Sequence, residues 1–114
     1  MDVPTDCPQR DERMGWTGDA QIFSGAACYN MDCAAFYDKF MTDLWLEQKL
    51  AAGAVPTVVP LPKYMAGGDG FGNHVYGVSP WSDAAVMIPW NLYLHYRDRT
   101  MLKRHYEPMK AWTD

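Results

Sequence analysis

The amino-acid sequence predicts an all-α fold, made of two helical hairpins that flank a long loop rich in Gly and Pro. Apolar residues recur at three- and four-residue steps before position 51 and after position 81, which is the spacing of amphipathic helices. In each hairpin, a largely buried helix is followed by one with a single apolar face. This alternation favours a two-layered helical ring, and two hairpins are too few to close such a ring.

The first hairpin is expected to contain a helix over residues 19–29 and a second helix that starts after Asp32 and reaches about Leu50. Asp19 is placed to cap the first helix, and Asp32 precedes the second as another residue of the capping type. Gly53 is expected to end the second helix. A wide apolar stripe along the second helix is formed by Phe36, Phe40, Leu44, Tyr37, Met41 and Trp45.

Residues 54–80 form the predicted loop. Pro56, Pro60 and Pro62 exclude a helix there and favour extended or edge-strand backbone. The Gly-rich stretch that follows is long enough to suggest a functional or disordered loop. Its GGDGFG sequence lacks the spacing of a phosphate-binding loop, so we expect no nucleotide there.

The second hairpin is expected to begin with a helix over residues 82–97, apolar around most of its circumference and kinked at Pro89. A one-sided helix then runs from near Asp98 to the end of the chain, and Pro108 can divide it into two pieces. No Gly or Pro stop signal occurs in the last turn. We therefore expect residues 1–114 to be one incomplete domain.

The amino-acid composition limits the classes of molecule that the chain is expected to bind. The net charge is -4 and no run of Lys and Arg occurs, which argues against nucleic acid. Aromatic residues make up 14% of the chain, which fits either a core of large side chains or a site for sugars. The chain shows neither a secretory signal nor a membrane span, so the expected location is cytoplasmic.

Three cysteines, at positions 7, 28 and 33, form no CxxC pair. Cys28 and Cys33 could be joined with His74 as metal ligands, but their spacing matches no zinc pattern. We expect reduced, mostly buried thiols, no metal and no cofactor.

Residues 6–19 contain the cluster of acidic, basic and aromatic side chains that is the best candidate for a catalytic site. Taken singly, their acids could be helix caps or solvated ion pairs, and the tryptophan could be core. Together they suit glycoside hydrolysis, which needs a carboxylic acid to protonate the leaving oxygen and a second carboxylate to activate water or attack. Glu12 has a neighbouring acid and an aromatic ring one helical turn away, both of which help a carboxyl keep its proton. The charged and aromatic residues of the cluster are Asp6, Arg10, Asp11, Glu12, Arg13, Trp16 and Asp19.

The stretch DVPTDCPQRDERMGWTGDAQIF resembles the catalytic motif of glycoside hydrolase family 78, the α-L-rhamnosidases with a six-hairpin helical toroid. AACYNMDCAAFYDKFMTDL is similar to the helix after that motif, and AVPTVVP to the loop towards the site. SPWSDAAVMIPW resembles the family's GWxDAAVxxPW helix. The resemblance covers nearly the whole chain and implies a partial (α/α)6 toroid.

The resemblance also implies roles. Glu12 matches the general acid, Asp6 the acid that holds rhamnose hydroxyls, and Asp19 the other acid of the motif. Trp16 matches the aromatic that packs against the sugar, and Trp81 lies in a motif, shared with Asp83, that also faces the site. From the residues themselves, Arg10 or Arg13 can keep a neighbouring acid ionised, and Arg10 is a further expected substrate-binding residue.

The family inverts configuration, so its second carboxylate is a general base, expected on a hairpin beyond residue 114. The chain alone is therefore expected to be inactive and to need the rest of the domain or to self-associate. The expected substrate is a rhamnose-containing glycoside or polysaccharide. Two alternatives stay open: a six-hairpin glycosidase for another sugar, and a non-catalytic sugar-binding remnant.

Overall fold

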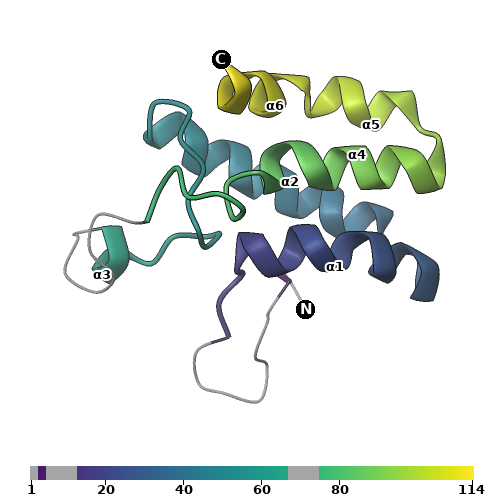
Figure 1. The fold of residues 1–114 in the computed structure, drawn as a ribbon, viewed down its shortest axis with the longest axis horizontal. Helices are drawn as coiled ribbons and strands as arrows, with labels where there is room; N and C mark the ends of the chain where they lie inside the picture. Colours follow the sequence, from purple (N-terminus) through teal and green to yellow (C-terminus); the bar gives the residue numbers. More distant parts are fainter. Residues whose placement is uncertain (1–2, 5–12, 67–74) are drawn as a thin grey trace.

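The computed structural model describes residues 3–4, 13–66 and 75–114 (Figure 1). Within these residues the backbone is helical or irregular and forms no strand. The helices are α1 (Thr17–Asn30), α2 (Ala34–Leu50), α3 (Lys63–Ala66), α4 (Ala84–Tyr96), α5 (Arg99–Arg104) and α6 (Tyr106–Thr113). The Gly-rich residues 67–74 and the segment 5–12 lie outside the described residues.

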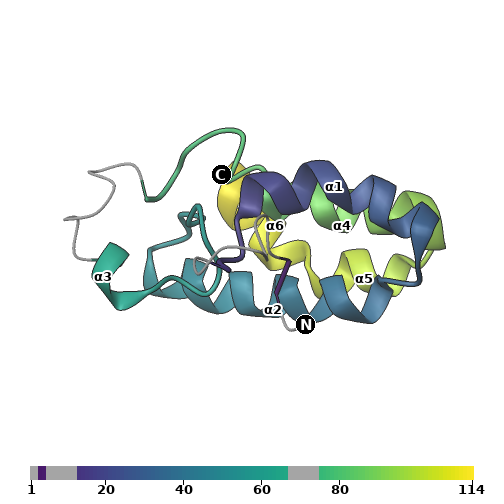
Figure 2. The same ribbon diagram turned by 90° about the horizontal axis from the view of Figure 1, so that it is seen from below.

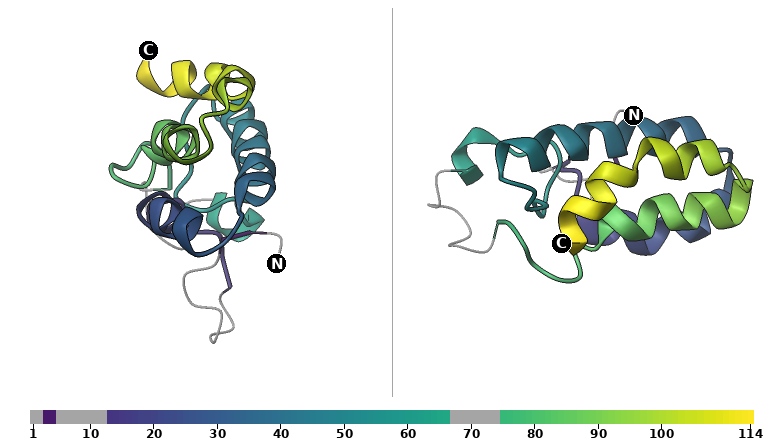
Figure 3. Two further views of the ribbon diagram at one scale, coloured as in Figure 1. Left: turned by 90° about the vertical axis from the view of Figure 1, so that its right-hand side faces the viewer. Right: turned by 90° about the horizontal axis from the view of Figure 1, so that it is seen from above.

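The helices form two layers, as the sequence predicts. α1 and α4 pack side by side and point the same way, while α2 and the α5–α6 pair lie in the second layer (Figures 2 and 3). α4 is the central helix, because it contacts α1, α2, α5 and α6. The N-terminal ends of α1 and α4 lie at the same end of this helix pair, on the side from which the loop with α3 extends (Figure 1).

The start of α1 differs from the prediction. The helix begins at Thr17 after Trp16, so Asp19 lies in its first turn and is not its N-cap. The side chain of Trp16, the residue before the helix, makes no capping hydrogen bond. The backbone N–H of Thr17 instead donates to the carbonyl of Thr57 at 2.9 Å, which satisfies one of the amide groups that a helix start leaves unpaired. Tertiary contact with the loop replaces the local capping signal.

The ends of α2 agree better with the sequence. Cys33 is the residue before the helix, and the Asp32 carboxylate accepts a hydrogen bond from the Ala34 N–H at 3.3 Å. Gly53 follows the last turn with φ of 93°, and its N–H donates to the Gln48 carbonyl at 2.7 Å. This left-handed conformation favours glycine, so the predicted stop is confirmed.

The second hairpin consists of one continuous helix and an outer helix that is divided in two, as predicted. α4 continues through Pro89 as one helix. Asp98 caps α5 by accepting from the Thr100 N–H at 2.8 Å. The outer helix then divides at His105 into α5 and α6. Pro108 explains the break, because its ring lacks an N–H and clashes with the carbonyl four residues earlier.

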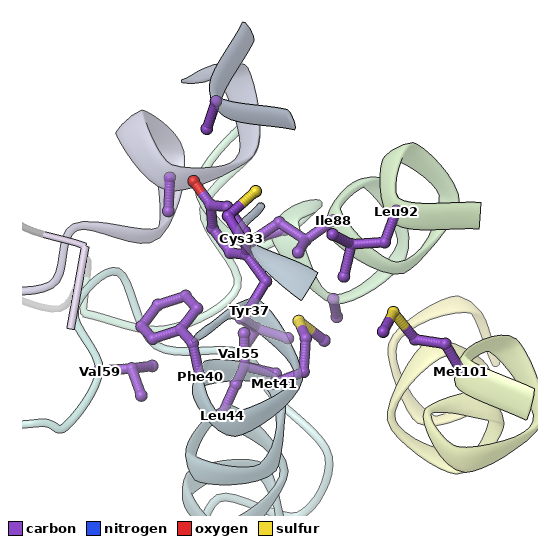
Figure 4. Close-up of a cluster of buried hydrophobic side chains, with 14 residues drawn as sticks. Cys33, Tyr37, Phe40, Met41, Leu44, Val55, Val59, Ile88, Leu92 and Met101 are labelled. Carbon is purple, nitrogen blue, oxygen red and sulfur yellow. The ribbon is translucent and has the colours of Figure 1, made fainter. Parts of the chain in front are cut away.

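The core lies between the two layers and against the loop (Figure 4). The predicted stripe of α2 supplies its centre, where the side chains of Phe40, Met41 and Leu44 are fully buried. Other members come from the loop, α4 and α5: Val55, Val59, Ile88, Leu92 and Met101. The burial of this stripe therefore determines which face of α2 points into the core.

Apolar side chains also cover faces that nothing in the described part of the chain packs against. On α1, Ile22 and Phe23 are 76% and 54% exposed. On α4, Met87, Trp90 and Leu94 are each more than 40% exposed. α4 therefore carries apolar side chains on its exposed face as well as on its buried face, which confirms the prediction that it is apolar around most of its circumference. In the part of the chain that the structure describes, no helix combines the length and hydrophobicity needed to cross a bilayer.

Candidate functional site

Three irregular segments, residues 14–16, 55–59 and 75–82, meet at the N-terminal ends of α1 and α4. Isolated antiparallel bridges join Trp16 to Val58 and Pro56 to Tyr76. The Val59 N–H donates to the Gly15 carbonyl at 2.9 Å, the Thr57 N–H to Val75 at 2.8 Å and the Gly77 N–H to Val55 at 3.1 Å. The predicted extended loop therefore forms a small backbone layer under the candidate site.

Thr17 fastens α1 to this layer. Its side chain is fully buried, and its hydroxyl lies 3.1 Å from the Pro56 carbonyl and 3.0 Å from the Thr57 carbonyl. A hydroxyl carries one hydrogen, so the two carbonyls share one donor. The result is a fixed first turn for α1, the turn that carries the WTGD part of the catalytic motif.

Two glycines allow the close approach of the segments. A Cβ on Gly15 would lie 2.3 Å from the Val59 carbonyl oxygen, and a Cβ on Gly18 would lie 2.9 Å from the Trp81 ring. The Trp81 ring therefore rests directly on the first turn of α1. The sequence shows both glycines beside Trp16, but only the tertiary structure shows what each one makes room for.

Further contacts support Trp81 from both sides. Gln21 donates through Nε2 to the Pro80 carbonyl at 2.5 Å, and the Ser82 hydroxyl donates to the Val55 carbonyl at 2.9 Å. Trp81 itself is half-buried, and its buried indole N–H donates to no group among the described residues. The structure thus brings Trp81 beside the first turn of α1, as the resemblance implies.

Trp16 and Asp19 flank that turn. Trp16 immediately precedes α1 and is half-buried, whereas Asp19 is exposed in the first turn. The amide groups at a helix N-terminus favour a negative charge, so this position suits an ionised carboxylate. Together with Trp81, these side chains bring two aromatic rings and one acid to the same end of α1.

The remaining predicted site residues, Asp6, Arg10 and Glu12, lie outside the described residues. One premise for Glu12 is wrong: residues 13–16 are not helical, and Arg13 has a positive φ of 46°. Trp16 is therefore not one helical turn away from Glu12. The role of Glu12 stays a prediction from the motif.

Asp83 has a structural role in this chain. Its Oδ1 accepts from the Trp112 indole N–H at 3.1 Å, and its Oδ2 accepts from the Ser79 hydroxyl at 2.8 Å. Both carboxylate oxygens are thus engaged in holding the loop before α4 against α6. The sequence did not predict this contact, because Asp83 and Trp112 lie on separate predicted helices.

A cavity of about 710 Å³ lies between α1 and α2. Its walls are mainly apolar, and Asp19 and Asp32 are the acids that line it. The apolar walls suit the packing of another helix better than the binding of a hydroxyl-rich sugar. Among the described residues, no group of three or more acids, histidines and cysteines is placed to hold a metal ion.

Comparison with known proteins assigns the class. Residues 1–114 match the family described as the bacterial alpha-L-rhamnosidase 6 hairpin glycosidase domain. Curated α-L-rhamnosidases from Alteromonas sp. and Formosa agariphila are 39% and 40% identical to the chain over 112 residues. Each alignment covers 98% of this chain, and the chain spans about 11% of the length of these relatives.

Solved structures agree with the sequences. The Streptomyces avermitilis α-L-rhamnosidase in complex with L-rhamnose superposes with a TM-score of 0.82 and 42% identity, over 96% of this chain and 10% of that one. The α-L-rhamnosidase of Dictyoglumus thermophilum gives 0.80 and 42%, over 98% of this chain and 12% of that one. The fold is therefore part of a helical-hairpin glycosidase domain. The chain belongs to the bacterial α-L-rhamnosidase six-hairpin family.

Proposed function

We propose that this chain supplies the general-acid side of an α-L-rhamnosidase active site, which hydrolyses terminal α-L-rhamnosyl residues with inversion once the domain is complete. The observation that carries the proposal is the fixed first turn of α1, where Trp16, Asp19 and the Trp81 ring meet within a match to the family over residues 1–114. The rhamnose complex of the Streptomyces avermitilis relative supports the choice of sugar.

Each residue has a defined part in the proposed reaction. Glu12 donates a proton to the glycosidic oxygen as the bond to the aglycone breaks. Asp6, Arg10 and Asp19 hold the sugar hydroxyls, and the rings of Trp16 and Trp81 cover its apolar face. The site binds the sugar from one side and leaves the opposite face open to water.

The general base must act on that opposite face. In inverting glycosidases the two carboxyl groups stand roughly 6.5–9.5 Å apart, which leaves room for the attacking water. Carboxylates as close in sequence as those of residues 6–19 lie on the same side of the sugar. We therefore place the base on a later hairpin of the domain, outside this chain.

A chimera tests the proposal. Residues 1–114 replace the matching segment of the Streptomyces avermitilis enzyme, and hydrolysis is followed with p-nitrophenyl α-L-rhamnoside beside aryl glycosides of other sugars. We expect hydrolysis of the rhamnoside and little of the others. Preference for another aryl glycoside would instead support the alternative of a six-hairpin glycosidase with different specificity.

The alternative of a sugar-binding remnant is separated by calorimetry. If the chimera is inactive but the chain alone gives saturable heat with L-rhamnose, the chain binds the sugar without taking part in hydrolysis. That pair of results would contradict the proposed catalytic role.

A further inference from the structure

Two cysteine side chains meet at the turn between α1 and α2. Cys28 lies in the last turn of α1, Cys33 immediately precedes α2, and their Sγ atoms are 3.4 Å apart. Both are free thiols, with Cys28 half-buried and Cys33 only 4% exposed. Neither residue takes part in the candidate site, which lies at the other end of α1.

The surroundings hold Cys33 in this position. Its backbone N–H donates to the Tyr96 hydroxyl at 3.0 Å, and that hydroxyl lies 3.7 Å from the Cys33 Sγ. Tyr96 is the last residue of α4, so the ends of α1, α2 and α4 converge on the sulfur pair. The placement of the two sulfurs is therefore set by tertiary contacts as well as by their closeness in sequence.

Little movement is needed to join the sulfurs. An S–S bond is about 2.05 Å long, so the gap of 3.4 Å must close by about 1.4 Å. Residues 31–33 are not helical, and Met31 has the extended backbone of φ -158° and ψ 159°. Rotation within this turn can bring the sulfurs together without unwinding either helix.

We propose that Cys28 and Cys33 form a reversible intramolecular disulfide that staples the α1–α2 turn when the chain meets a low-molecular-weight disulfide. The Cys28 thiolate attacks one sulfur of the external disulfide, whose S–S bond breaks and releases one thiolate. The Cys33 thiolate then attacks the Cys28 sulfur of the mixed disulfide and expels the second thiolate. Two electrons pass from the cysteine pair to the oxidant, and the two cysteine protons end on the two released thiols.

The order of attack follows from exposure, because Cys28 is more accessible than Cys33. Burial, together with the neighbouring Cys33, raises the pKa of the Cys28 thiol to about 11. Little thiolate therefore exists near neutral pH, and the reaction is slow there. Its rate should rise by about tenfold per pH unit above neutrality, as the thiolate fraction does below the pKa.

The test is a redox titration of the 114-residue chain carrying Cys7→Ser, which removes the third cysteine. The chain is equilibrated with mixtures of reduced and oxidised glutathione, the free thiols are alkylated, and tryptic fragments are weighed. Residues 14–39 form one tryptic fragment that holds both cysteines. The reduced fragment therefore carries two alkyl groups, whereas the disulfide form carries none and is two hydrogen atoms lighter than the unmodified dithiol. The ratio of oxidised to reduced fragment gives the effective concentration of the thiol pair.

The same titration in concentrated urea supplies the comparison. We expect an effective concentration in buffer at least about tenfold above that in urea. The folded chain holds the two sulfurs together, so folding favours the disulfide, and the disulfide stabilises the fold by the same free energy. Cys28→Ser and Cys33→Ser should each stop at the mixed disulfide with glutathione. A ratio of one or less between buffer and urea would overturn the proposal, and so would disulfides that form mainly between chains.

Discussion

Gly18 is the residue on which the position of Trp81 depends most directly. A Cβ at this position would lie 2.9 Å from the Trp81 ring, so the ring occupies the space that a side chain would fill. The sequence did not predict the contact between Gly18 and Trp81, because no local feature indicates that residues this far apart in the chain meet. The motif thus named Trp16, Asp19 and Trp81 as candidate site residues, whereas the packing of Trp81 on the first turn of α1 required the tertiary structure.

Substitution of this glycine tests the contact. Gly18→Ala should lower the free energy of unfolding by about 1–3 kcal/mol, because the ring must move to admit the methyl group. Urea denaturation followed by tryptophan fluorescence measures the change.

Gly25 is the matched control in the same helix, because among the described residues a Cβ there would meet only the Asn91 Nδ2 at 3.9 Å. Gly25→Ala should raise stability by about 0.5–1 kcal/mol through helix propensity. If both variants shift stability in the same direction and by the same amount, the Trp81 contact does not constrain Gly18.

His105 is a second residue whose surroundings the sequence did not predict. It is 2% exposed, and its Nε2 lies 2.7 Å from Oδ1 of Asp38, which also pairs with Arg104. Burial lowers the pKa of His105 below its ordinary value of 6.5, and the Asp38 carboxylate opposes this only in part. His105 is therefore neutral in the fold and donates to Asp38 through Nε2–H.

The pH dependence follows from this direction. His105 binds a proton less readily in the folded chain than in the unfolded chain, so protonation favours unfolding. Stability is therefore unaffected by this group above pH 6.5 and declines as the pH falls below that value. Chemical denaturation at a series of pH values should show this decline. His105→Gln keeps an N–H donor but cannot titrate, so its profile should be flatter; an unchanged profile would show that another group is responsible.

At the scale of elements, α2 shows how well apolar spacing predicts packing. The predicted stripe is confirmed, and Leu44 at its centre is fully buried, while Leu46 in the same helix is 55% exposed. The hairpin order and the interruption near Pro108 were also predictable, because both rest on local periodicity and on proline geometry.

A pair of leucine variants tests this assignment. Leu44→Ala should cost about 2–5 kcal/mol of stability, because it leaves a cavity in the core. Leu46→Ala should change stability by no more than about 0.5 kcal/mol, as is usual for exposed positions. Equal losses in thermal or urea unfolding would contradict the packing of α2.

The loop between the hairpins was less predictable. Its prolines excluded a helix over residues 54–62 correctly, but the short helix α3 within the predicted loop was not expected. The hydrogen bonds between Gly15 and Val59 and between the Thr17 N–H and Thr57 join backbone groups, which leave no signature in the sequence, and no local pattern marks the Thr17 hydroxyl as a further donor to the loop. The error at the start of α1 has the same origin. Asp19 had the right chemistry for an N-cap, yet the Thr57 carbonyl satisfied the helix start two residues earlier.

At the scale of the whole molecule, the exposed faces of α1 and α4 limit what the chain can do alone. Side chains such as Phe23, Trp90 and Leu94 are exposed on these faces, and large exposed apolar surfaces are rare on soluble monomers. We expect the isolated chain to associate and to hydrolyse no p-nitrophenyl α-L-rhamnoside. Light scattering and the aryl rhamnoside assay measure both; robust turnover that Glu12→Gln abolishes would show that several copies assemble a working site.

The most direct test of the account is the leaving-group dependence of Glu12→Gln in the chimera with the Streptomyces avermitilis enzyme. A general acid contributes about 10²–10⁴-fold when the leaving oxygen needs a proton, and p-nitrophenolate needs little help to leave. We predict a loss in that range for methyl α-L-rhamnoside and a much smaller loss for p-nitrophenyl α-L-rhamnoside, while Asp19→Asn lowers both rates alike. Equal losses for the two substrates in Glu12→Gln would contradict the assignment of the general acid to this chain.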